Sequence, residues 1–279
     1  MIVYPCAKIN LGLNIVSRRP DGYHNLETVF YPIPLSDTLE VSELPPSLKS
    51  GHTCQLSLSG NTLEGKTEDN LVVKAYRLLA EHYTLPPIQV HLHKEIPSQA
   101  GLGGGSSDAA YMILILNEMF QLGLDYHQME EYAARLGADC AFFIQSQPAY
   151  ATGIGDQLTL FDNETISLEG YYMAIVKPDI AVSTQEAYAR INPQKPAECC
   201  KDIILQSVDK WKDSLSNDFE IPIFASYPQI RHIKESLYGK GALYAQMSGS
   251  GSAVFAIFRN HPQDIATAYK DCFTSVFQL

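Results

Sequence analysis

The chain has 279 residues and a formal net charge of -11, and 46% of its residues are hydrophobic while 18% are charged. This composition is typical of a globular protein, and the length allows one large domain or two ordinary ones. The acidic balance disfavours a nucleic-acid-binding surface, which is usually basic, but it permits a local site for a small anion. No apolar run reaches the roughly 18 residues that a membrane span needs.

The first residues, MIVYPCAKINLGLNIV, are typical of a strand and have neither the basic region nor the separate apolar region of a signal peptide. We therefore expect no signal or transit peptide. The six cysteines are scattered and include no CxxC pair, which argues against a zinc ribbon. These features predict a cytoplasmic protein with reduced thiols, most of them acting as small core residues. The oligomeric state is left open between monomer and homodimer.

Alternating apolar and polar residues predict strands in the first third of the chain, at residues 9–16, 37–44 and 54–60. A Pro-Asp-Gly sequence at residues 20–22 predicts a tight turn after the first of them. Residues 70–82 have helical spacing, and alternation returns over residues 88–96.

Residues 109–120 are apolar around most of a helical circumference, which predicts a buried helix that ends near Gly123. A second helix is expected over residues 126–136. Beyond it we expect a strand at 171–176, helices at 185–191, 201–215 and 229–237, a hairpin of 242–247 with 253–258, and a last helix from about Pro262.

Strands and helices are partly segregated along the chain, which predicts an α+β protein and not a doubly wound sheet. The pattern becomes polar and irregular over residues 156–169. We place a domain boundary in that stretch, which gives one domain of residues 1–160 and a second of residues 161–279.

A glycine-rich stretch stands between the strand at 88–96 and the buried helix. It consists of Gly101, Leu102, Gly103, Gly104, Gly105, Ser106 and Ser107. Glycines let several backbone N–H groups converge on one anion, and the start of a helix adds unpaired N–H groups and the positive end of its dipole. A flexible linker would not separate a strand from a buried helix, so the stretch predicts an anion cradle. Asp108 follows directly, and its carboxylate would repel a phosphate unless it turns away or helps to hold a metal.

Three common nucleotide-binding patterns are absent. The P-loop pattern GxxxxGK[ST] is absent because no lysine follows the glycines, and the dinucleotide-binding pattern GxGxxG is absent because Ser106 stands at its last position. The chain also has neither the HRD nor the DFG motif of the protein kinases. The spacing P-x-x-x-G-L-G-G-G-S-S at residues 97–107 instead resembles the ATP-binding motif of the GHMP kinases, which include galactokinase, homoserine kinase, mevalonate kinase and phosphomevalonate kinase.

Other segments resemble motifs of the same family, in the same order, from about residue 7 to residue 258. They are AKINLGLNIVSRRPDGYHNLETVFYPIPLSDTLEV, LGADCAFFI, ATGIGDQL, VSTQEAY, NDFE and MSGSGSAVFAIF. The resemblance implies a two-domain GHMP kinase fold, with an N-terminal ATP-binding domain that contains a left-handed βαβ unit and a C-terminal ferredoxin-like domain. It also implies an ATP-dependent small-molecule kinase that phosphorylates an alcohol group of a cytidine-diphosphate-linked polyol.

The resemblance assigns roles to individual residues. Lys8 and Asp139 would be catalytic: Asp139 would accept or orient the proton of the attacking hydroxyl, and Lys8 would stabilise charge. The ATP-binding positions would be Lys94, Pro97, Gly101, Leu102, Gly103, Gly104, Gly105, Ser106 and Ser107. The substrate-binding positions would be Asn10, Tyr23, His24, Thr184 and Tyr188. Mg²⁺ is expected to bind mainly through ATP, with no metal ligand assigned to the protein and neither nucleic acid nor membrane as a partner.

Simpler interpretations exist for most of these residues when the resemblance is set aside. Asp139 suits a helix N-cap, Lys8 an ordinary strand lysine and Lys94 a solvated strand residue. The sequences PDGYH and SGSG suit hairpin turns. His91 and His93 share one strand face, but without a third ligand in sight a solvated face is favoured over a metal site.

Two other functions stay open at this point. One is another GHMP kinase acting on homoserine or a mevalonate derivative, and the other is a non-catalytic ligand-sensing protein on the same fold. The DGYH sequence argues against the first, because such a kinase needs no aromatic platform for a cytosine. The presence of both Lys8 and Asp139 argues against the second.

Overall fold

A computed structural model describes residues 1–45, 53–61, 65–161 and 166–279. The chain forms two compact units that interleave along the sequence. The first consists of Met1–Ala7, Leu35–Ser98 and Gly103–Ser146, and the second of Lys8–Pro34, Gln99–Leu102 and Gln147–Leu279. The domain boundary at residues 160 and 161 stays a prediction, and part of the irregular stretch that suggested it lies outside the described residues.

The first unit contains a four-stranded sheet in the order β1-β4-β6-β5. Its strands are β1 (Ile2–Val3), β4 (Thr38–Glu43), β5 (Cys54–Gly60) and β6 (Ile88–Lys94). The strands β5 and β6 are parallel neighbours, whereas β4 pairs antiparallel with both β1 and β6. The helix α1 (Leu71–Ala80) lies between β5 and β6 in the chain, so these three elements form a βαβ unit.

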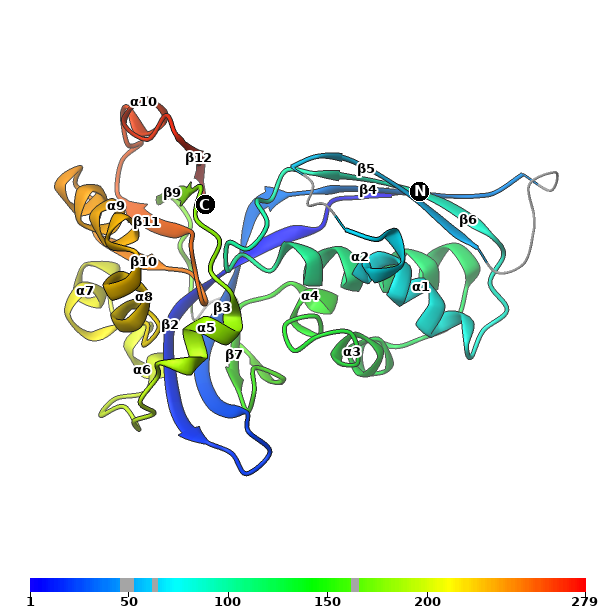
Figure 1. The fold of residues 1–279 in the computed structure, drawn as a ribbon, viewed down its shortest axis with the longest axis horizontal. Helices are drawn as coiled ribbons and strands as arrows, with labels where there is room; N and C mark the ends of the chain where they lie inside the picture. The colour runs from blue at the N-terminus through cyan, green and yellow to red at the C-terminus, as the bar shows by residue number, and fades with distance from the viewer. Residues whose placement is uncertain (46–52, 62–64, 162–165) are drawn as a thin grey trace. The chain divides into compact units, whose positions relative to one another are not determined.

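Helices cover one face of this sheet, as Figure 1 shows for α1 and α2. Alternation explains the layering, because Val90 and Leu92 of β6 are buried while the alternating residues Gln89 and His91 are exposed. The helices are α2 (Gly104–Phe120), α3 (Tyr126–Ala134) and α4 (Phe142–Gln145). The apolar surface of α2 is buried, as its sequence predicts, but α2 begins within the glycine-rich stretch and therefore earlier than expected.

The second unit contains two sheets. The sheet β2-β3-β7-β8 is built from two long strands and two short ones, β2 (Cys6–Arg18), β3 (His24–Ser36), β7 (Ala149–Thr152) and β8 (Gln157–Leu160). The predicted Pro-Asp-Gly turn joins β2 and β3. The N–H of Arg19 donates to the carbonyl of Tyr23 at 2.8 Å across it, and Gly22 has a φ of +87°.

The other sheet of the second unit has the order β10-β11-β9-β12, and all its pairs are antiparallel. Its strands are β9 (Tyr172–Pro178), β10 (Tyr244–Met247), β11 (Val254–Phe258) and β12 (Cys272–Gln278). Helices separate β9 from β10 and β11 from β12, which gives the β-α-β-β-α-β order of a ferredoxin-like domain. The predicted ferredoxin-like fold is therefore confirmed.

The helices of the second unit are short apart from one. They are α5 (Thr184–Ala189), α6 (Cys200–Ile203), α7 (Trp211–Ser214), α8 (Glu220–Ser226), α9 (Pro228–Gly239) and α10 (Ile265–Ala268). The single helix expected at 201–215 is interrupted, because Ser207 has an extended backbone with a φ of −62° and a ψ of 144°. The last helix is confined to α10, and β12 follows it as an unpredicted strand. No helix of the described residues is long and apolar enough to cross a membrane.

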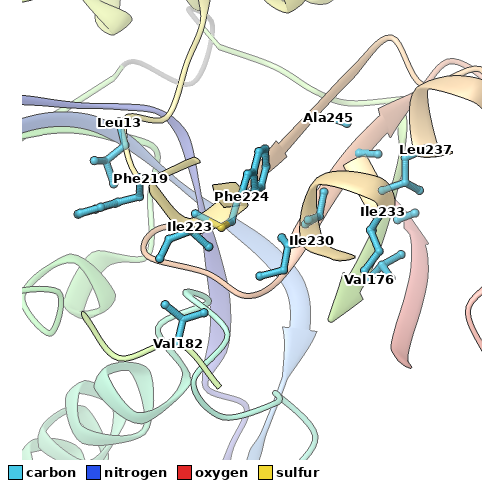
Figure 2. Close-up of a cluster of buried hydrophobic side chains, with 14 of the residues drawn as sticks. Leu13, Val176, Val182, Phe219, Ile223, Phe224, Ile230, Ile233, Leu237 and Ala245 are labelled. Carbon is cyan, nitrogen blue, oxygen red and sulfur yellow. The ribbon is translucent and has the colours of Figure 1, made fainter. Parts of the chain in front are cut away.

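A hydrophobic cluster joins the helices of the second unit to its sheets, and Figure 2 shows part of it. Ile223 on α8 and Ile230 and Ile233 on α9 pack together with Val176 of β9 and Ala245 of β10. The spacing of the isoleucines on α9 puts both on one face, which is the pattern of an amphipathic helix packed on a sheet.

Two isoleucines on α8 provide a matched test of this core. Ile223 is 1% exposed and belongs to the cluster, whereas Ile221 is 77% exposed. We expect Ile223→Ala to lower the free energy of unfolding by about 2–5 kcal/mol, because it removes buried methyl groups and leaves a cavity. Ile221→Ala should change it by less than about 0.5 kcal/mol. Urea unfolding of both variants measures the difference, and equal losses would contradict this packing.

Candidate active site

The segment Gln99–Leu102, which includes the first two residues of the glycine-rich stretch, belongs to the second unit and is held by hydrogen bonds. The N–H of Lys8 donates to the carbonyl of Leu102 at 2.9 Å, and the N–H of Ala253 donates to that of Ala100 at 3.1 Å. The Ser248 hydroxyl donates to the carbonyl of Gly101 at 2.9 Å. A Cβ on Gly101 would lie 1.9 Å from the Ser248 carbonyl oxygen, and its φ is +75°, so only glycine fits.

The rest of the stretch belongs to the first unit and forms the start of α2. Gly103 is the N-cap in a left-handed conformation with a φ of 73°, and Gly104 is the first helical residue. Gly104, Gly105, Ser106 and Ser107 thus make up the first turn. The first N–H groups of a helix have no carbonyl partner within it and carry the positive end of the dipole. This turn therefore has the geometry of an anion site.

A buried ion cluster lies directly behind this turn. The Lys94 ammonium at the end of β6 pairs with Asp108 Oδ2 of α2 at 2.5 Å and with Asp37 Oδ2. Asp37 Oδ1 accepts hydrogen bonds from the N–H groups of Glu95 and Ile96 at 2.6 and 2.9 Å. The Lys94 side chain is only 11% exposed, so its interpretation as a solvated strand residue is wrong.

Burial and the ion pairs act in opposite directions on the pKa values of Asp108 and Lys94. Burial raises the pKa of Asp108 to about 7, and the neighbouring Asp37 adds to the rise while Lys94 opposes it. Burial lowers the pKa of Lys94, but the carboxylates of Asp108 and Asp37 outweigh it, so that its pKa is raised. Asp108 is thus turned towards Lys94 inside the unit. Its Oδ1 and the Ser107 hydroxyl are buried and have no hydrogen-bond partner in the described structure.

Asp139 lies half-buried in the turn that precedes α4. The N-cap of α4 is Ala141, so the interpretation of Asp139 as that N-cap is wrong. The turn lies against the start of α2, because a Cβ on Gly137 would meet Cys140 Sγ at 3.2 Å and Ser106 Oγ at 4.0 Å. The first unit therefore brings the Asp139 turn and the first turn of α2 together.

A chain of buried polar side chains connects β2 with β3. The Lys8 ammonium donates to Asn10 Oδ1 at 2.7 Å, Asn10 Nδ2 donates to Thr28 Oγ1 at 2.9 Å, and that hydroxyl donates to the Gly12 carbonyl at 2.5 Å. Lys8 also lies over the Phe30 ring, 4.9 Å from its centre. Lys8 and Asn10 are 3% and 2% exposed, so Lys8 is not an ordinary exposed strand lysine.

Three aromatic rings meet, one at the start of β3, one on α5 and one at the N-cap of α8. The His24 ring stacks on the Tyr188 ring, with 5.1 Å between centres and 19° between planes, and Phe219 meets Tyr188 edge-on at 4.8 Å. Thr184 begins α5, and its Oγ1 lies 3.4 Å from Ser250 Oγ. Tyr23 is 63% exposed and lies outside this stack. Burial, and Arg18 to a smaller extent, lower the pKa of His24, which favours the neutral imidazole at pH 7.

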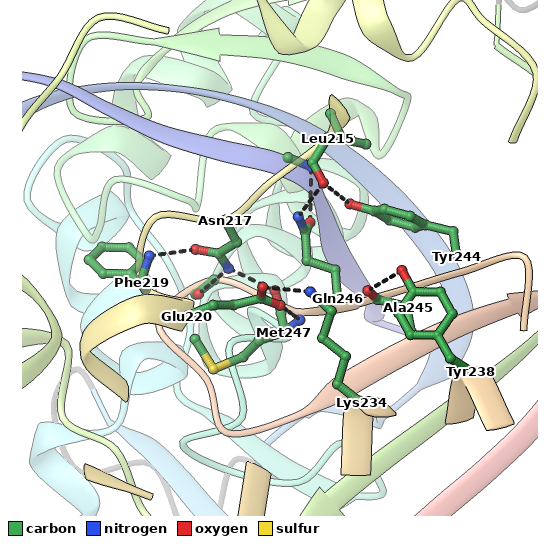
Figure 3. A network of polar contacts seen from close by, with 12 residues as sticks. Leu215, Asn217, Phe219, Glu220, Lys234, Tyr238, Tyr244, Ala245, Gln246 and Met247 are labelled. Carbon is green, nitrogen blue, oxygen red and sulfur yellow. Dashed lines mark hydrogen bonds and ion pairs between the residues drawn. The ribbon is translucent and has the colours of Figure 1, made fainter. Parts of the chain in front are cut away.

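The SGSG segment between β10 and β11 is fixed by Asn217. Figure 3 shows Asn217 with Phe219 and Met247, which lie on either side of its amide group. The Asn217 amide donates to the carbonyls of Met247 and Gly249 at 2.7 and 2.9 Å, and its Oδ1 accepts from the N–H of Phe219. Glu220 accepts from the N–H of Met247 at 2.8 Å and pairs with Lys234 at 2.6 Å. This network holds both the SGSG segment and the backbone of Phe219.

The predicted site residues fall into two groups by unit. The second unit contains Lys8, Asn10, Tyr23, His24, Gly101, Leu102, Thr184 and Tyr188, and the first contains Lys94, Pro97, Gly103, Gly104, Gly105, Ser106, Ser107 and Asp139. The two catalytic candidates therefore belong to different units. His91 and His93 both lie 2.9 Å from Ser59 Oγ on the outer face of their sheet, which supports the solvated-face interpretation.

Sequence reasoning missed Asp37, Thr28 and Phe219 as parts of these clusters. Phe219 belongs to the NDFE motif, so a signal for it was present. Asp37 and Thr28 also lie within a family motif, the one at residues 7–41. That motif does not point to their partners, because 57 residues separate Lys94 from Asp37 and 18 separate Asn10 from Thr28.

Comparison with known proteins shows to which protein family this chain belongs. A model of the GHMP kinase N-terminal domain matches residues 70–147, and one of the GHMP kinase C-terminal domain matches residues 201–274. These matches include the helical part of the glycine-rich stretch, the Asp139 turn and most of the ferredoxin-like domain. The fold is therefore that of a GHMP kinase.

Individual relatives identify a narrower family within the GHMP kinases. Proteins named 4-diphosphocytidyl-2-C-methyl-D-erythritol kinase from Bacteroides fragilis and Parabacteroides distasonis are 54% and 48% identical, over 92% and 100% of both chains. A crystal structure of 4-(cytidine 5'-diphospho)-2C-methyl-D-erythritol kinase matches with a TM-score of 0.82 and 27% identity over 100% of both chains. This chain belongs to the 4-diphosphocytidyl-2-C-methyl-D-erythritol kinase family. It is an ATP-dependent small-molecule kinase.

The shifted pKa of Asp108 predicts a pH-dependent stability. Its folded pKa of about 7 exceeds the ordinary value of 3.8, so the folded chain retains a proton that the unfolded chain has lost. The stabilisation is complete below the ordinary pKa and is lost as the pH rises towards 7. We expect the wild type to lose stability relative to Asp108→Asn between pH 5 and about pH 8, because asparagine does not titrate.

Urea unfolding at several pH values measures this difference. Asp69→Asn, which changes an exposed aspartate of the same unit, is the control and should run parallel to the wild type at each pH. A stability difference between wild type and Asp108→Asn that stays constant over this range would contradict the assignment.

Proposed function

We propose that this kinase transfers the γ-phosphoryl group of ATP to the 2-hydroxyl of 4-diphosphocytidyl-2-C-methyl-D-erythritol, a step of non-mevalonate isoprenoid biosynthesis. The observation that carries this proposal is the 54% identity to a kinase of that name over 92% of both chains. Phosphoryl transfer needs mainly positioning and charge stabilisation, and the buried polar clusters of the two units are suited to both.

The ATP phosphates would bind at the first turn of α2. The helix start offers N–H groups, Gly104 and Gly105 carry no side chains, and the Ser106 hydroxyl is a further donor. Gly101 and Leu102, which precede this turn, would complete the cradle, and Lys94 and Pro97 would lie beside the nucleotide. Mg²⁺ would be held mainly by the phosphates and water. It would neutralise charge on the transferring group.

Asp139 and Lys8 would carry the chemistry. In this proposal the Asp139 carboxylate accepts or orients the proton of the 2-hydroxyl, and the Lys8 ammonium stabilises negative charge on the transferring phosphoryl group. The bond from Lys8 to Asn10 supports the role of Lys8, because it fixes a cation that is buried and cannot relax with solvent. Asn10 would contact the substrate from the same strand.

The aromatic rings of the second unit would bind the cytosine end of the substrate. His24 and Tyr188 offer flat faces for stacking, and a neutral imidazole supplies one donor and one acceptor for a base edge. The two rings stack on each other, so a base would either cover one outer face or separate them. Tyr23 and Thr184, both exposed, would contact the rest of the substrate.

Two further expectations accompany this function. The six cysteines form no disulfide, which supports a cytoplasmic location for the enzyme. The division into domains of residues 1–160 and 161–279 is part of the proposal, and the family matches at residues 70–147 and 201–274 lie on either side of that boundary.

A substrate comparison tests the proposed reaction. The purified protein is incubated with ATP, Mg²⁺ and either 4-diphosphocytidyl-2-C-methyl-D-erythritol, homoserine or mevalonate, and the release of ADP is followed. Of the three acceptor substrates, we expect turnover only with 4-diphosphocytidyl-2-C-methyl-D-erythritol. Turnover with homoserine or mevalonate in its place would overturn the assignment, and no turnover with any of them would favour a sensing protein.

A neutral substitution at Asp139 tests its role. We expect Asp139→Asn to lower kcat by about 10²–10⁴-fold, because the amide cannot accept the hydroxyl proton. ATP binding, measured by calorimetry, should persist, since the phosphate cradle is intact. Asp69→Asn, the same change at an exposed position, should leave both quantities unchanged. Near-normal turnover of Asp139→Asn would exclude the role given to this carboxylate.

A further inference from the structure

A buried carboxylate outside the proposed active site faces two adjacent cysteines. Glu27 on β3 is 9% exposed, and its carboxylate, Cys199 Sγ and Cys200 Sγ all lie within 4.8 Å of one another. Cys199 is the N-cap of α6 and Cys200 is its first residue. Neither thiol is in a disulfide. The kinase chemistry described above uses none of these three side chains.

The Glu27 carboxylate is held by uncharged donors. Its Oε1 accepts from Asn14 Nδ2 at 2.9 Å and from the N–H of Cys200 at 3.1 Å, and its Oε2 accepts from the Tyr150 hydroxyl at 3.0 Å. Burial raises the pKa of Glu27, but these hydrogen bonds outweigh it and leave the pKa below its ordinary value. A negative charge is therefore retained in a buried place, where a cation would be favourable.

The two thiols lie close to each other and to this carboxylate. Cys200 is fully buried, and burial together with Glu27 raises the pKa of its thiol, so that it stays protonated without a metal. The Cys199 thiol donates to the Tyr150 hydroxyl at 3.2 Å. That hydroxyl thus bridges a thiol and the carboxylate, at the place where a shared ligand would bind both.

A glycine on β2 permits α6 to approach so closely. Gly12 has a φ of +70°, and a Cβ there would lie 2.9 Å from the Cys200 Cβ and 2.6 Å from a methyl carbon of Leu215. Any larger residue would force Cys200 away from Glu27. The arrangement of two thiols and a carboxylate therefore depends on a specific backbone contact and is not a chance grouping of surface residues.

We propose that Glu27, Cys199 and Cys200 form a binding site for one thiophilic divalent cation, of the class of Zn²⁺ or Cd²⁺. On binding, two S–H bonds break, two metal–sulfur bonds form and two protons pass to the solvent, while the carboxylate supplies the third ligand. Water fills the fourth position of a tetrahedral ion. Two thiolates select against Mg²⁺, so this site is separate from the Mg²⁺ that accompanies ATP.

The three ligand atoms need to move only a short distance to reach the spacing of a zinc site. Bonds of about 2.3 Å from a tetrahedral zinc to sulfur place two sulfurs roughly 3.8 Å apart. The potential ligand atoms already lie within 4.8 Å of one another, so side-chain rotations that shorten the distances by about 1 Å are enough. The Tyr150 hydroxyl would release Cys199 in that movement and keep its bond to Glu27 as a support for the ligand.

A cadmium titration of the full-length protein tests the proposal. Cd²⁺ is added in the presence of a phosphine reductant, and the thiolate-to-metal absorption in the ultraviolet is followed, with Zn²⁺ as a competitor. We expect one Cd²⁺ per chain. Two protons should be released for each Cd²⁺ bound, which a pH indicator in weakly buffered solution measures.

Matched variants test whether the Cd²⁺ absorption comes from the cluster of Glu27, Cys199 and Cys200. Cys200→Ser and Glu27→Gln should each weaken Cd²⁺ binding at least about 10-fold, whereas Cys272→Ser, at another partly buried cysteine, should leave it unchanged. Zn²⁺ should raise the melting temperature of the wild type and of Cys272→Ser, because it binds only the folded chain. Circular dichroism confirms that each variant is folded, and Glu27→Gln keeps the test valid if Cys200→Ser does not fold.

Three outcomes would overturn the proposal. The first is no thiolate absorption at saturating Cd²⁺. The second is equal affinity in Cys200→Ser and Cys272→Ser, which would place binding at other cysteines. The third is an unchanged affinity in Glu27→Gln, which would leave the carboxylate with a purely structural part in a hydrogen-bonded cluster.

Discussion

The arrangement of the first unit depends on the buried ammonium of Lys94. It joins the end of β6 to Asp37, before β4, and to Asp108 in α2, so three segments distant in sequence meet at one group. Asp37 also accepts the backbone N–H groups that follow Lys94, which fixes the chain leading into the glycine-rich stretch. Buried carboxylates without such a cation would be strongly destabilising, so this group and the position of the helix start depend on each other.

The same cluster explains how a carboxylate is tolerated next to a phosphate site. One lysine and two aspartates sum to a charge of about -1 when both acids are ionised, and to zero when one is protonated. Burial favours the protonated form of Asp108. The net charge of the cluster of Lys94, Asp37 and Asp108 therefore tends towards zero. The helix start therefore keeps its attraction for anions although an acid follows it directly in the chain.

The sequence predicted the parts of this protein that depend on local pattern. Period-two alternation located the strands around Leu92 and Leu13, and the glycines identified the helix start, though one turn too late, because Gly104 and Gly105 have poor helix propensity. It could not predict β12, which exists by pairing with β9, or the partners of Lys94 and Asn10. Those depend on tertiary contacts that no local pattern records. The family motifs supplied the site residues that periodicity alone left as turns, caps and strand positions.

The interleaving of the two units has a consequence for the gene. A fragment that begins at residue 161 would lack β2 and β3, and one that ends at residue 160 would carry those two strands without the sheet of β9 to β12. Each unit takes more than one piece of the chain, so neither can be inherited, duplicated or fused to another protein as a single uninterrupted coding segment. An exchange of the coding sequence at residue 160 would therefore divide the second unit, whose strands β2 and β3 lie before that point.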